Sequence, residues 1–304
     1  MGRVVRLVRA SGPVLAAGLL IGGSGPAVAE GRPMAVLDEV IATSAWSPAS
    51  PDPSGLASSR ATGRILVSDG EVDETDLFRG SNVFDMREGG RLKGSFGLTR
   101  FTNEPAGIAL RPGALGTMFV VDDQAARIFI VRWGHDGRWG TKDDRARSFR
   151  TRTLGCADAE GLAFGRRSLF VACGTTDEIV RVRPGRDGRF DGAAPDGDDR
   201  VTSFDTTELG LTDVEAVEYD AWTGHLLIAA KQGRAISEVT LGGRPVYDID
   251  ISMSGISHPA GITLVRSDSD PATAKVYVAD RGVDNGSDPD ENDGRIFVFT
   301  VTWP

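Results

Sequence analysis

Acidic side chains recur at matching places along this 304-residue sequence, and they are the residues most able to do chemistry. Carboxylate oxygens are hard ligands that suit Ca²⁺ or another divalent cation such as Mg²⁺. The acids that we expect to be metal ligands are Glu104, Asp158, Glu160, Asp213, Glu215, Asp69, Asp73, Asp122, Asp280 and Asp284. The alternative is a structural role, in which each acid accepts hydrogen bonds from backbone amides of a neighbouring strand.

Two related segments carry a second group of acids. Residues 134–144 and 185–199 share the order Asp-Gly-Arg-aromatic, and each ends in a pair of aspartates. The acids concerned are Asp136, Asp143, Asp144, Asp187, Asp198 and Asp199. Such Asp-Gly segments are compatible with a bound structural Ca²⁺ and equally with tight turns. The sequence leaves both interpretations open.

Histidine and cysteine offer less chemistry. Of His135, His225 and His258, only His258 stands in a position equivalent to the acids, where it would serve an enzyme as general base; a loop histidine without a catalytic role is the alternative. No G-x-S-x-G or H-E-x-x-H motif occurs. Cys156 and Cys173 flank two expected strands that pair, which predicts a disulfide; two buried free thiols are the alternative.

The elements that must position these residues repeat along the chain. Each repeat has a polar or acidic residue, then x-Gly-aliphatic, then apolar runs of four to six residues that indicate strands. The anchor residues Gly55, Gly107, Gly161, Ala216 and Gly261 are 52, 54, 55 and 45 residues apart. Units of about 50 residues with room for four strands predict an all-β fold, a β-propeller. Five four-stranded blades are expected; six blades, or an irregular β-sandwich, are the alternatives.

The last repeat ends at Pro304 after its third strand, so its outer strand must come from elsewhere. Residues 35–42 form an apolar run without a blade of its own, and we expect this N-terminal strand to close the ring. In a propeller the starts of the innermost strands share one face with the loops between second and third strands. On this face, here called the upper face, lie the first group of acids and His258; residues 134–144 and 185–199 lie on the opposite, lower face.

Charge and composition exclude several classes of protein. The sequence has 43 acidic residues against 34 Lys and Arg, a net charge of −9, so it has no basic footprint for nucleic acid. Hydrophobic residues make up 40% of the chain, which is enough to bury a core and argues against disorder.

The N-terminus has the order of a secretory signal peptide. Arg3, Arg6 and Arg9 precede an apolar stretch at residues 14–21, and small residues follow at 27–29. We therefore expect residues 1–29 to be a signal peptide and residues 30–304 to be a single propeller domain; an uncleaved anchor is the alternative. The mature protein would carry a net charge of −12, with 31 basic and 43 acidic residues. It would be secreted or periplasmic, with no membrane span after cleavage.

Some segments resemble a known superfamily of propellers. Residues 103–109, Asn-Glu-Pro-Ala-Gly-Ile-Ala, and residues 169–172, Leu-Phe-Val-Ala, resemble blades of the NHL, SMP-30/gluconolactonase-like and SdiA-regulated superfamily. The resemblance covers most of residues 50–300, and residues 278–294 look like the tail of uncharacterised exported bacterial propellers. It implies the fold, and the superfamily includes metal-dependent lactonases. Propeller phytases look similar in using calcium among upper carboxylates, but Lys231, Arg234 and Arg281 are few for a phytate site.

Two functions fit these observations. The first is an exported, monomeric, calcium-binding propeller that recognises a small-molecule ligand or a cell-surface or extracellular partner through its acidic upper face. The second is a metal-dependent hydrolase, lactonase-like or esterase-like, in which a divalent cation on the propeller axis polarises a carbonyl and activates a water. In the second case Glu104, Glu160 or Glu215 would hold the ion and His258 would be the base.

Overall fold

The computed structural model describes residues 31–70, 75–113, 116–232, 234–282, 288 and 290–304. The expected signal peptide, Asp73 and Asp284 lie outside these residues. Residues Gly31–Pro304 form one compact unit of β-strands. Its described part contains three short 3₁₀ helices, Thr43–Ala45, Thr151–Leu154 and Thr207–Leu209. No helix in the described part is long and apolar enough to cross a membrane.

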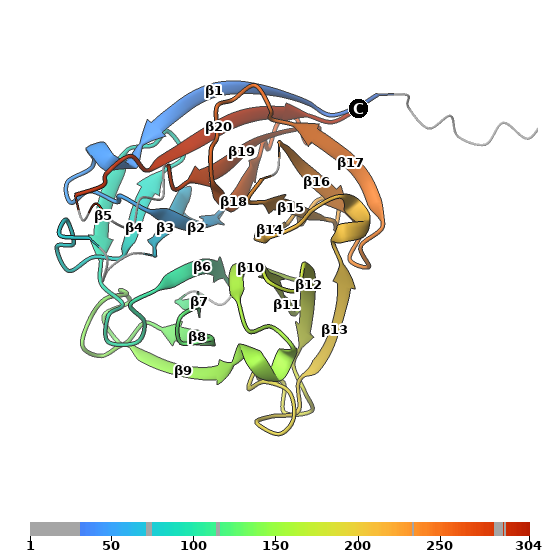
Figure 1. Ribbon diagram of the computed structural model, residues 1–304. Helices are drawn as coiled ribbons and strands as arrows, with labels where there is room; N and C mark the ends of the chain where they lie inside the picture. The colour runs from blue at the N-terminus through green and yellow to red at the C-terminus, as the bar shows by residue number, and fades with distance from the viewer. Residues whose placement is uncertain (1–30, 71–74, 114–115, 233, 283–287, 289) are drawn as a thin grey trace, which may run out of the picture. The chain divides into compact units, whose positions relative to one another are not determined.

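The strands form five antiparallel sheets of four strands each, arranged around an axis as the blades of a propeller (Figure 1). In each of the first four blades the innermost strand comes first in the chain and the outermost strand comes last. These blades are β2 (Pro53–Ser59), β3 (Arg64–Asp69), β4 (Val83–Arg87) and β5 (Leu92–Phe96); β6 (Pro105–Leu110), β7 (Thr117–Asp122), β8 (Arg127–Arg132) and β9 (Arg145–Arg150); β10 (Ala159–Gly165), β11 (Ser168–Cys173), β12 (Glu178–Arg183) and β13 (Arg200–Asp205); and β14 (Val214–Tyr219), β15 (Leu226–Ala230), β16 (Ala235–Val239) and β17 (Pro245–Asp250). The prediction of an all-β propeller with five four-stranded blades is confirmed.

The fifth blade closes the ring with strands from both ends of this unit. It consists of β18 (Pro259–Arg266), β19 (Thr273–Asp280), β20 (Arg295–Thr302) and, outermost, β1 (Met34–Ala42). β1 pairs antiparallel with β20 along its length (Figure 1). The predicted closure by an N-terminal strand is therefore confirmed, and backbone hydrogen bonds hold the ring shut.

The innermost strands approach one another so closely that four of the five need the glycine of the repeat; the fourth blade has Ala216 at this position. A Cβ atom at Gly107 would lie 2.3 Å from the carbonyl oxygen of Glu160 in the next blade. At Gly161 it would lie 2.5 Å from the carbonyl oxygen of Glu215. Real Cβ atoms do not come this close to a backbone oxygen, so at these two positions only glycine allows the packing around the axis. The regularly spaced glycines of the sequence therefore mark the positions where neighbouring blades are in contact.

The hydrophobic core lies between neighbouring blades. Phe119 of β7 stacks on Phe164 of β10, with ring centroids 5.4 Å apart, and Phe190 packs edge-on against both. Phe190 belongs to the lower-face segment 185–199, so the aromatic residue of that Asp-Gly-Arg-aromatic pattern is a buried anchor. Trp139 occupies the same place in the pattern of segment 134–144 and stacks on Phe96. Core packing therefore fixes both lower loops to the propeller.

Candidate functional site

Irregular pairing at the start of the innermost strands directs acidic side chains toward the axis on the upper face. In β10 and β14 the residue-by-residue pairing with the next strand shifts around Glu160 and Glu215. Such β-bulges turn a side chain away from the regular alternation of a strand. Asp158 and Asp213 stand two residues before these glutamates, and both lie close enough to Glu215 to act on its carboxylate. Blades three and four thus each contribute an Asp-x-Glu pair to one site.

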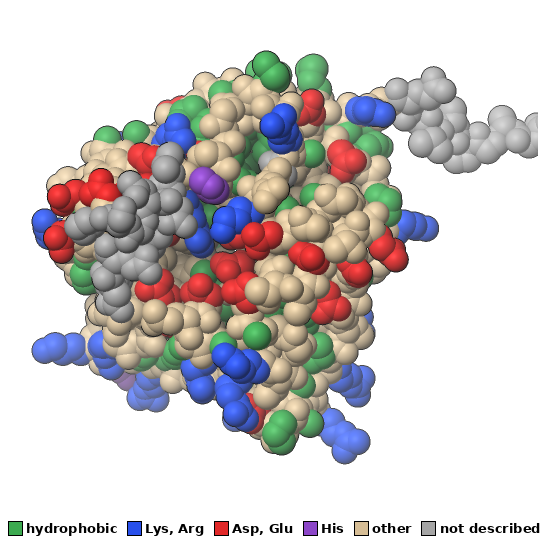
Figure 2. Space-filling view, in the orientation of Figure 1, with side chains coloured by type: hydrophobic (Ala, Val, Ile, Leu, Met, Phe, Trp, Pro, Cys, Tyr) green, Lys and Arg blue, Asp and Glu red, His purple; other side chains and the backbone are tan. Residues whose placement is uncertain are grey.

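A guanidinium group from the fifth blade lies among these carboxylates. Arg281, directly after β19, places Nε 3.7 Å from Oδ1 of Asp52 and Nη2 3.7 Å from Oε2 of Glu160. We call this group of residues the upper acidic cluster. It comprises Asp52, Asp123, Asp158, Glu160, Asp213 and Glu215, with the basic residues Arg281 and Lys231. Acidic side chains, with basic ones among them, gather around the centre of the face shown in Figure 2.

Burial and repulsion between the acids favour bound protons in the upper acidic cluster. Burial, together with the carboxylate of Glu215, raises the pKa of Glu160 to about 8. Burial also raises the pKa of Glu215 and the pKa of Asp123, although the charge of Arg281 opposes this. Burial alone would lower the pKa of Arg281, but the surrounding carboxylates more than offset it and raise that pKa. Arg281 is therefore always charged, while Glu160 is largely protonated at neutral pH.

Several groups of the cluster lack the hydrogen bonds that buried polar groups ordinarily make. Glu215 is only 5% exposed, yet in the described part of the chain its carboxylate takes part in no hydrogen bond and no ion pair. Oε2 of Glu160 and Nε of Arg281 are also buried without a hydrogen-bonding partner among the described residues. Since most buried polar groups in proteins are hydrogen-bonded, these donors and acceptors leave capacity for a bound molecule.

The carboxylates of the upper acidic cluster do not stand at the spacing of metal ligands. Among the described residues, one group of three acids has ligand atoms within 4.8 Å of one another, and it lies on the lower face. Ca²⁺ takes six to eight oxygens at about 2.3–2.6 Å, which requires closer convergence. A divalent cation was expected from the sequence to neutralise the carboxylates at the axis. Arg281 supplies part of that positive charge. A divalent cation held by Glu160 and Glu215 thus stays a prediction.

Other predicted metal ligands lie at strand ends and take part in the hydrogen bonding of the upper loops. Asp69 accepts a hydrogen bond from the hydroxyl of Ser50 at 2.6 Å. Asp122 accepts one from the hydroxyl of Thr102 at 2.7 Å. Glu104 directly precedes β6. Asp69 also accepts a hydrogen bond from the backbone N–H of Asp52 at 3.2 Å, and Asp122 one from that of Ala125 at 2.6 Å, which corresponds to the structural role that the sequence left open.

His258 is fixed by the end of β19. Its backbone N–H donates to Oδ1 of Asp280 at 2.7 Å, and Asp280, fully buried, also pairs with Arg295 at 2.9 Å. Nδ1 of His258 hydrogen-bonds the carbonyl oxygen of Gly282, which only a protonated Nδ1 does. In the neutral ring Nε2 is then the basic nitrogen.

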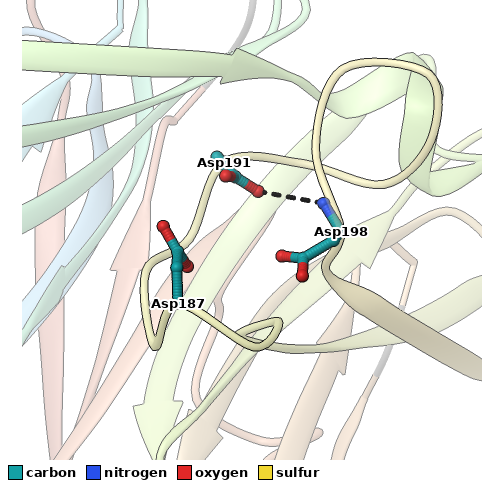
Figure 3. A group of neighbouring side chains, drawn as sticks. All are labelled: Asp187, Asp191 and Asp198. Carbon is teal, nitrogen blue, oxygen red and sulfur yellow. Dashed lines mark hydrogen bonds between the residues drawn. The ribbon is translucent and has the colours of Figure 1, made fainter.

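The lower face holds three aspartates at the spacing of metal ligands (Figure 3). Asp187, Asp191 and Asp198, between β12 and β13, have carboxylate oxygens within 4.8 Å of one another. The backbone N–H of Asp198 donates to Asp191 at 3.3 Å. Asp199 instead folds the loop by accepting hydrogen bonds from the backbone N–H groups of Asp191 and Gly192, both at 2.9 Å. The structure thus brings together Asp187 and Asp198 from the predicted group and adds Asp191, which the sequence analysis left out.

The related segment 134–144 lacks the third aspartate. Gly140 stands where the other segment has Asp191. Asp136, Asp143 and Asp144 all accept hydrogen bonds from backbone N–H groups of the same segment, at 2.9, 2.6 and 2.7 Å. This loop is therefore held by turn-forming aspartates, and it offers a natural comparison for its relative.

A disulfide stands beside the upper acidic cluster. It joins Cys156, before β10, to Cys173 at the end of β11, with Cα atoms 5.6 Å apart. The next residue, Gly174, lies between two acids: a Cβ atom there would be 2.9 Å from Oδ2 of Asp158 and 3.1 Å from Oδ1 of Asp213. The two carboxylates thus come close to the backbone of Gly174, where a side chain would have to displace them.

Asp52, Asp123 and Arg281 belong to this site but were not among the ligands expected from the sequence. A signal was present, because Asp122-Asp123 at the end of β7 and Asp280-Arg281 at the end of β19 are equivalent positions of two blades. Aligning the repeats would have shown that Arg281 stands where the second blade has Asp123.

No family model and no curated protein matches this sequence. Solved structures match by fold. A glutaminyl cyclase from Myxococcus xanthus has a TM-score of 0.55 and 14% identity, covering 89% of this chain and 97% of that chain. The PQQ-bound form of an aldose sugar dehydrogenase from Streptomyces coelicolor has a TM-score of 0.53 and 15% identity, covering 89% and 98%. A calcium-binding protein, regucalcin, from Agrobacterium tumefaciens strain C58 has a TM-score of 0.47 and 11% identity, covering 88% and 96%.

The first two of these likenesses, with TM-scores of 0.55 and 0.53, agree with the fold described above. At such identities they show the fold alone and leave the function to the site.

Proposed function

We propose that this protein is an exported, monomeric β-propeller that binds a small molecule, or a group on a surface partner, at the upper acidic cluster, without catalysis. One observation carries the proposal. Glu215 is buried, charged by type, and makes no hydrogen bond or ion pair in the described part of the chain. A buried carboxylate without partners destabilises a fold, and binding a ligand is a reason to keep one.

We further propose a calcium ion at Asp187, Asp191 and Asp198 on the lower face. Three carboxylate oxygens within 4.8 Å of one another support it, because backbone carbonyls of the loop and water can complete the shell of the ion. Phe190 anchors this loop in the core, so the ion would stabilise the propeller rather than take part in ligand binding.

The second candidate function, a hydrolase of lactone or ester bonds, is favoured by two groups on the upper face. His258 presents Nε2 as a base, and Glu160, with a raised pKa, is protonated at neutral pH and able to act as an acid. A metal-dependent form needs an ion at the axis, where Arg281 already lies. Binding without catalysis therefore stays the first proposal.

One set of measurements separates these functions. Turnover of lactones, carboxylic esters and phosphate esters is measured with and without Ca²⁺ on the wild type, Glu160→Gln and His258→Gln. The binding proposal expects no turnover above background in any protein. Turnover by the wild type that either substitution abolishes, with melting unchanged, would replace the binding proposal with the hydrolase.

A further inference from the structure

We propose that the molecule bound at the upper acidic cluster is a small organic ligand that carries a primary ammonium group together with a neighbouring oxygen acceptor. This inference rests on the proposed binding function and names the class of ligand for the same site.

The sign of the site gives the charge of the ligand. Six carboxylates, those of Asp52, Asp123, Asp158, Glu160, Asp213 and Glu215, act on one another around two basic groups, Arg281 and Lys231. Even with Glu160, Glu215 and Asp123 all protonated, the three remaining carboxylates outnumber the two basic groups. A ligand of net positive charge lowers this imbalance, whereas an anion increases it.

The distribution of charge within the site gives the polarity of the ligand. Asp158 and Glu160 come from the start of the third blade, and Asp213 and Glu215 from the start of the fourth. Arg281 comes from the fifth blade and has a buried Nε without a hydrogen-bonding partner among the described residues. The acids would accept hydrogen bonds from an ammonium group, and Arg281 would donate to an oxygen of the same molecule.

Two observations favour an organic cation over a metal ion here. The ligand atoms of the cluster do not meet within 4.8 Å, in contrast to those of the lower loop, so one ion does not reach three of them at bonding distance. Arg281 also lies 3.7 Å from both Asp52 and Glu160, and its charge repels a divalent ion placed between them. An organic ligand reaches separated acids through several atoms.

The acceptors for an ammonium group lie beside Gly174. An oxygen of Asp158 and an oxygen of Asp213 both lie close to the Cβ position of Gly174, at 2.9 and 3.1 Å, so the two carboxylates face the same point. In the described part of the chain, Asp158 accepts one hydrogen bond there, from the backbone N–H of Thr175 at 3.1 Å, and the carboxylate of Asp213 accepts none. An ammonium group has three N–H donors, which suits a site whose acceptors are unfilled.

The test is isothermal titration calorimetry on the full mature chain with matched pairs of probes. Glucosamine is compared with glucose, and ethanolamine with ethane-1,2-diol, so that each pair differs in one ammonium against one hydroxyl group. Calcium chloride is a separate titrant. The variants are Glu215→Gln and Asp213→Asn, because asparagine tolerates the left-handed backbone that Asp213 adopts at φ 55°. Asp187→Asn, on the lower face, is the control variant.

The inference expects an amine to bind the wild type and the control at least tenfold more tightly than its neutral analogue. Binding should weaken at least tenfold in each upper-face variant that is at least as stable as the wild type. Equal binding of a neutral analogue, or amine binding that neither variant changes, would overturn it. So would the failure of both amines to bind, or Ca²⁺ binding that depends on Glu215. If the amines do not bind, only the class of ligand is wrong. The binding function itself is tested separately by the stability of Glu215→Gln, a measurement that needs no ligand.

Discussion

Nη2 of Arg281 lies 3.7 Å from Oε2 of Glu160, so a side chain of the fifth blade reaches across the axis to a carboxylate of the third. The upper face therefore carries an internal cation at the place where the sequence suggested an ion. One guanidinium and Lys231 do not balance six carboxylates, and the remaining charge makes the site suitable for a ligand.

Removing Arg281 tests its role as the internal counter-ion. Arg281→Met removes the positive charge beside the carboxylates of Asp52 and Glu160, so the free energy of unfolding at pH 8 should fall by about 3 kcal/mol. Arg60→Met is the control, because Arg60 and Asp268 form an exposed pair, and it should change stability by less than about 0.5 kcal/mol. If urea denaturation gave the same loss of stability for Arg281→Met and Arg60→Met, Arg281 would not be an internal counter-ion.

The raised pKa of Glu160 predicts a definite pH dependence of stability. The folded protein holds a proton on Glu160 up to a pKa of about 8, whereas the unfolded chain releases it near the ordinary value of 4.5. Between these pH values the unfolded state binds fewer protons, so stability falls as pH rises, with a slope of up to about 1.4 kcal/mol per pH unit. Glu160→Gln should flatten the melting temperature across pH 5–8. An unchanged slope would show that Glu160 does not carry the proton.

The close contact of the innermost strands predicts a large cost for a single methyl group. Gly161→Ala places a Cβ atom 2.5 Å from the carbonyl oxygen of Glu215 and should destabilise the protein by about 2–3 kcal/mol. Gly94→Ala in the outer strand β5, where a Cβ atom meets nothing within 4 Å, is the control. It should be neutral or slightly stabilising in the same denaturation experiment.

Calcium should act through the lower loop. Added Ca²⁺ should raise the melting temperature of the wild type, since an ion that binds only the folded state stabilises it. Asp191→Gly copies the residue that the related segment has at Gly140 and should abolish the rise, whereas Asp136→Asn in that segment should leave it unchanged. A rise that survives Asp191→Gly would move the calcium site elsewhere.

The fold could be predicted from the sequence, because four of the five blades have a glycine where innermost strands touch, and the spacing of Gly55, Gly107, Gly161 and Gly261 reveals the repeat. The clustering of Glu160 with Glu215 followed from the same repeat. The partnership of Arg281 with Asp52 did not, because it depends on where a long side chain from one blade ends among side chains of others. In the same way, Asp191 joins Asp187 only through the folding of one loop, which the shared pattern does not encode.

The central claim is that Glu215 is kept for a ligand and not for the fold, and one measurement tests it without knowing the ligand. Burial raises the pKa of Glu215, which means that its surroundings disfavour the charged form. Replacing it by the neutral, equally shaped glutamine should therefore increase the free energy of unfolding of the ligand-free protein at pH 8 by about 1 kcal/mol. Glu39→Gln, at an exposed position of β1, should have no effect. A decrease of similar size in Glu215→Gln would show that the carboxylate supports the fold and would contradict the account.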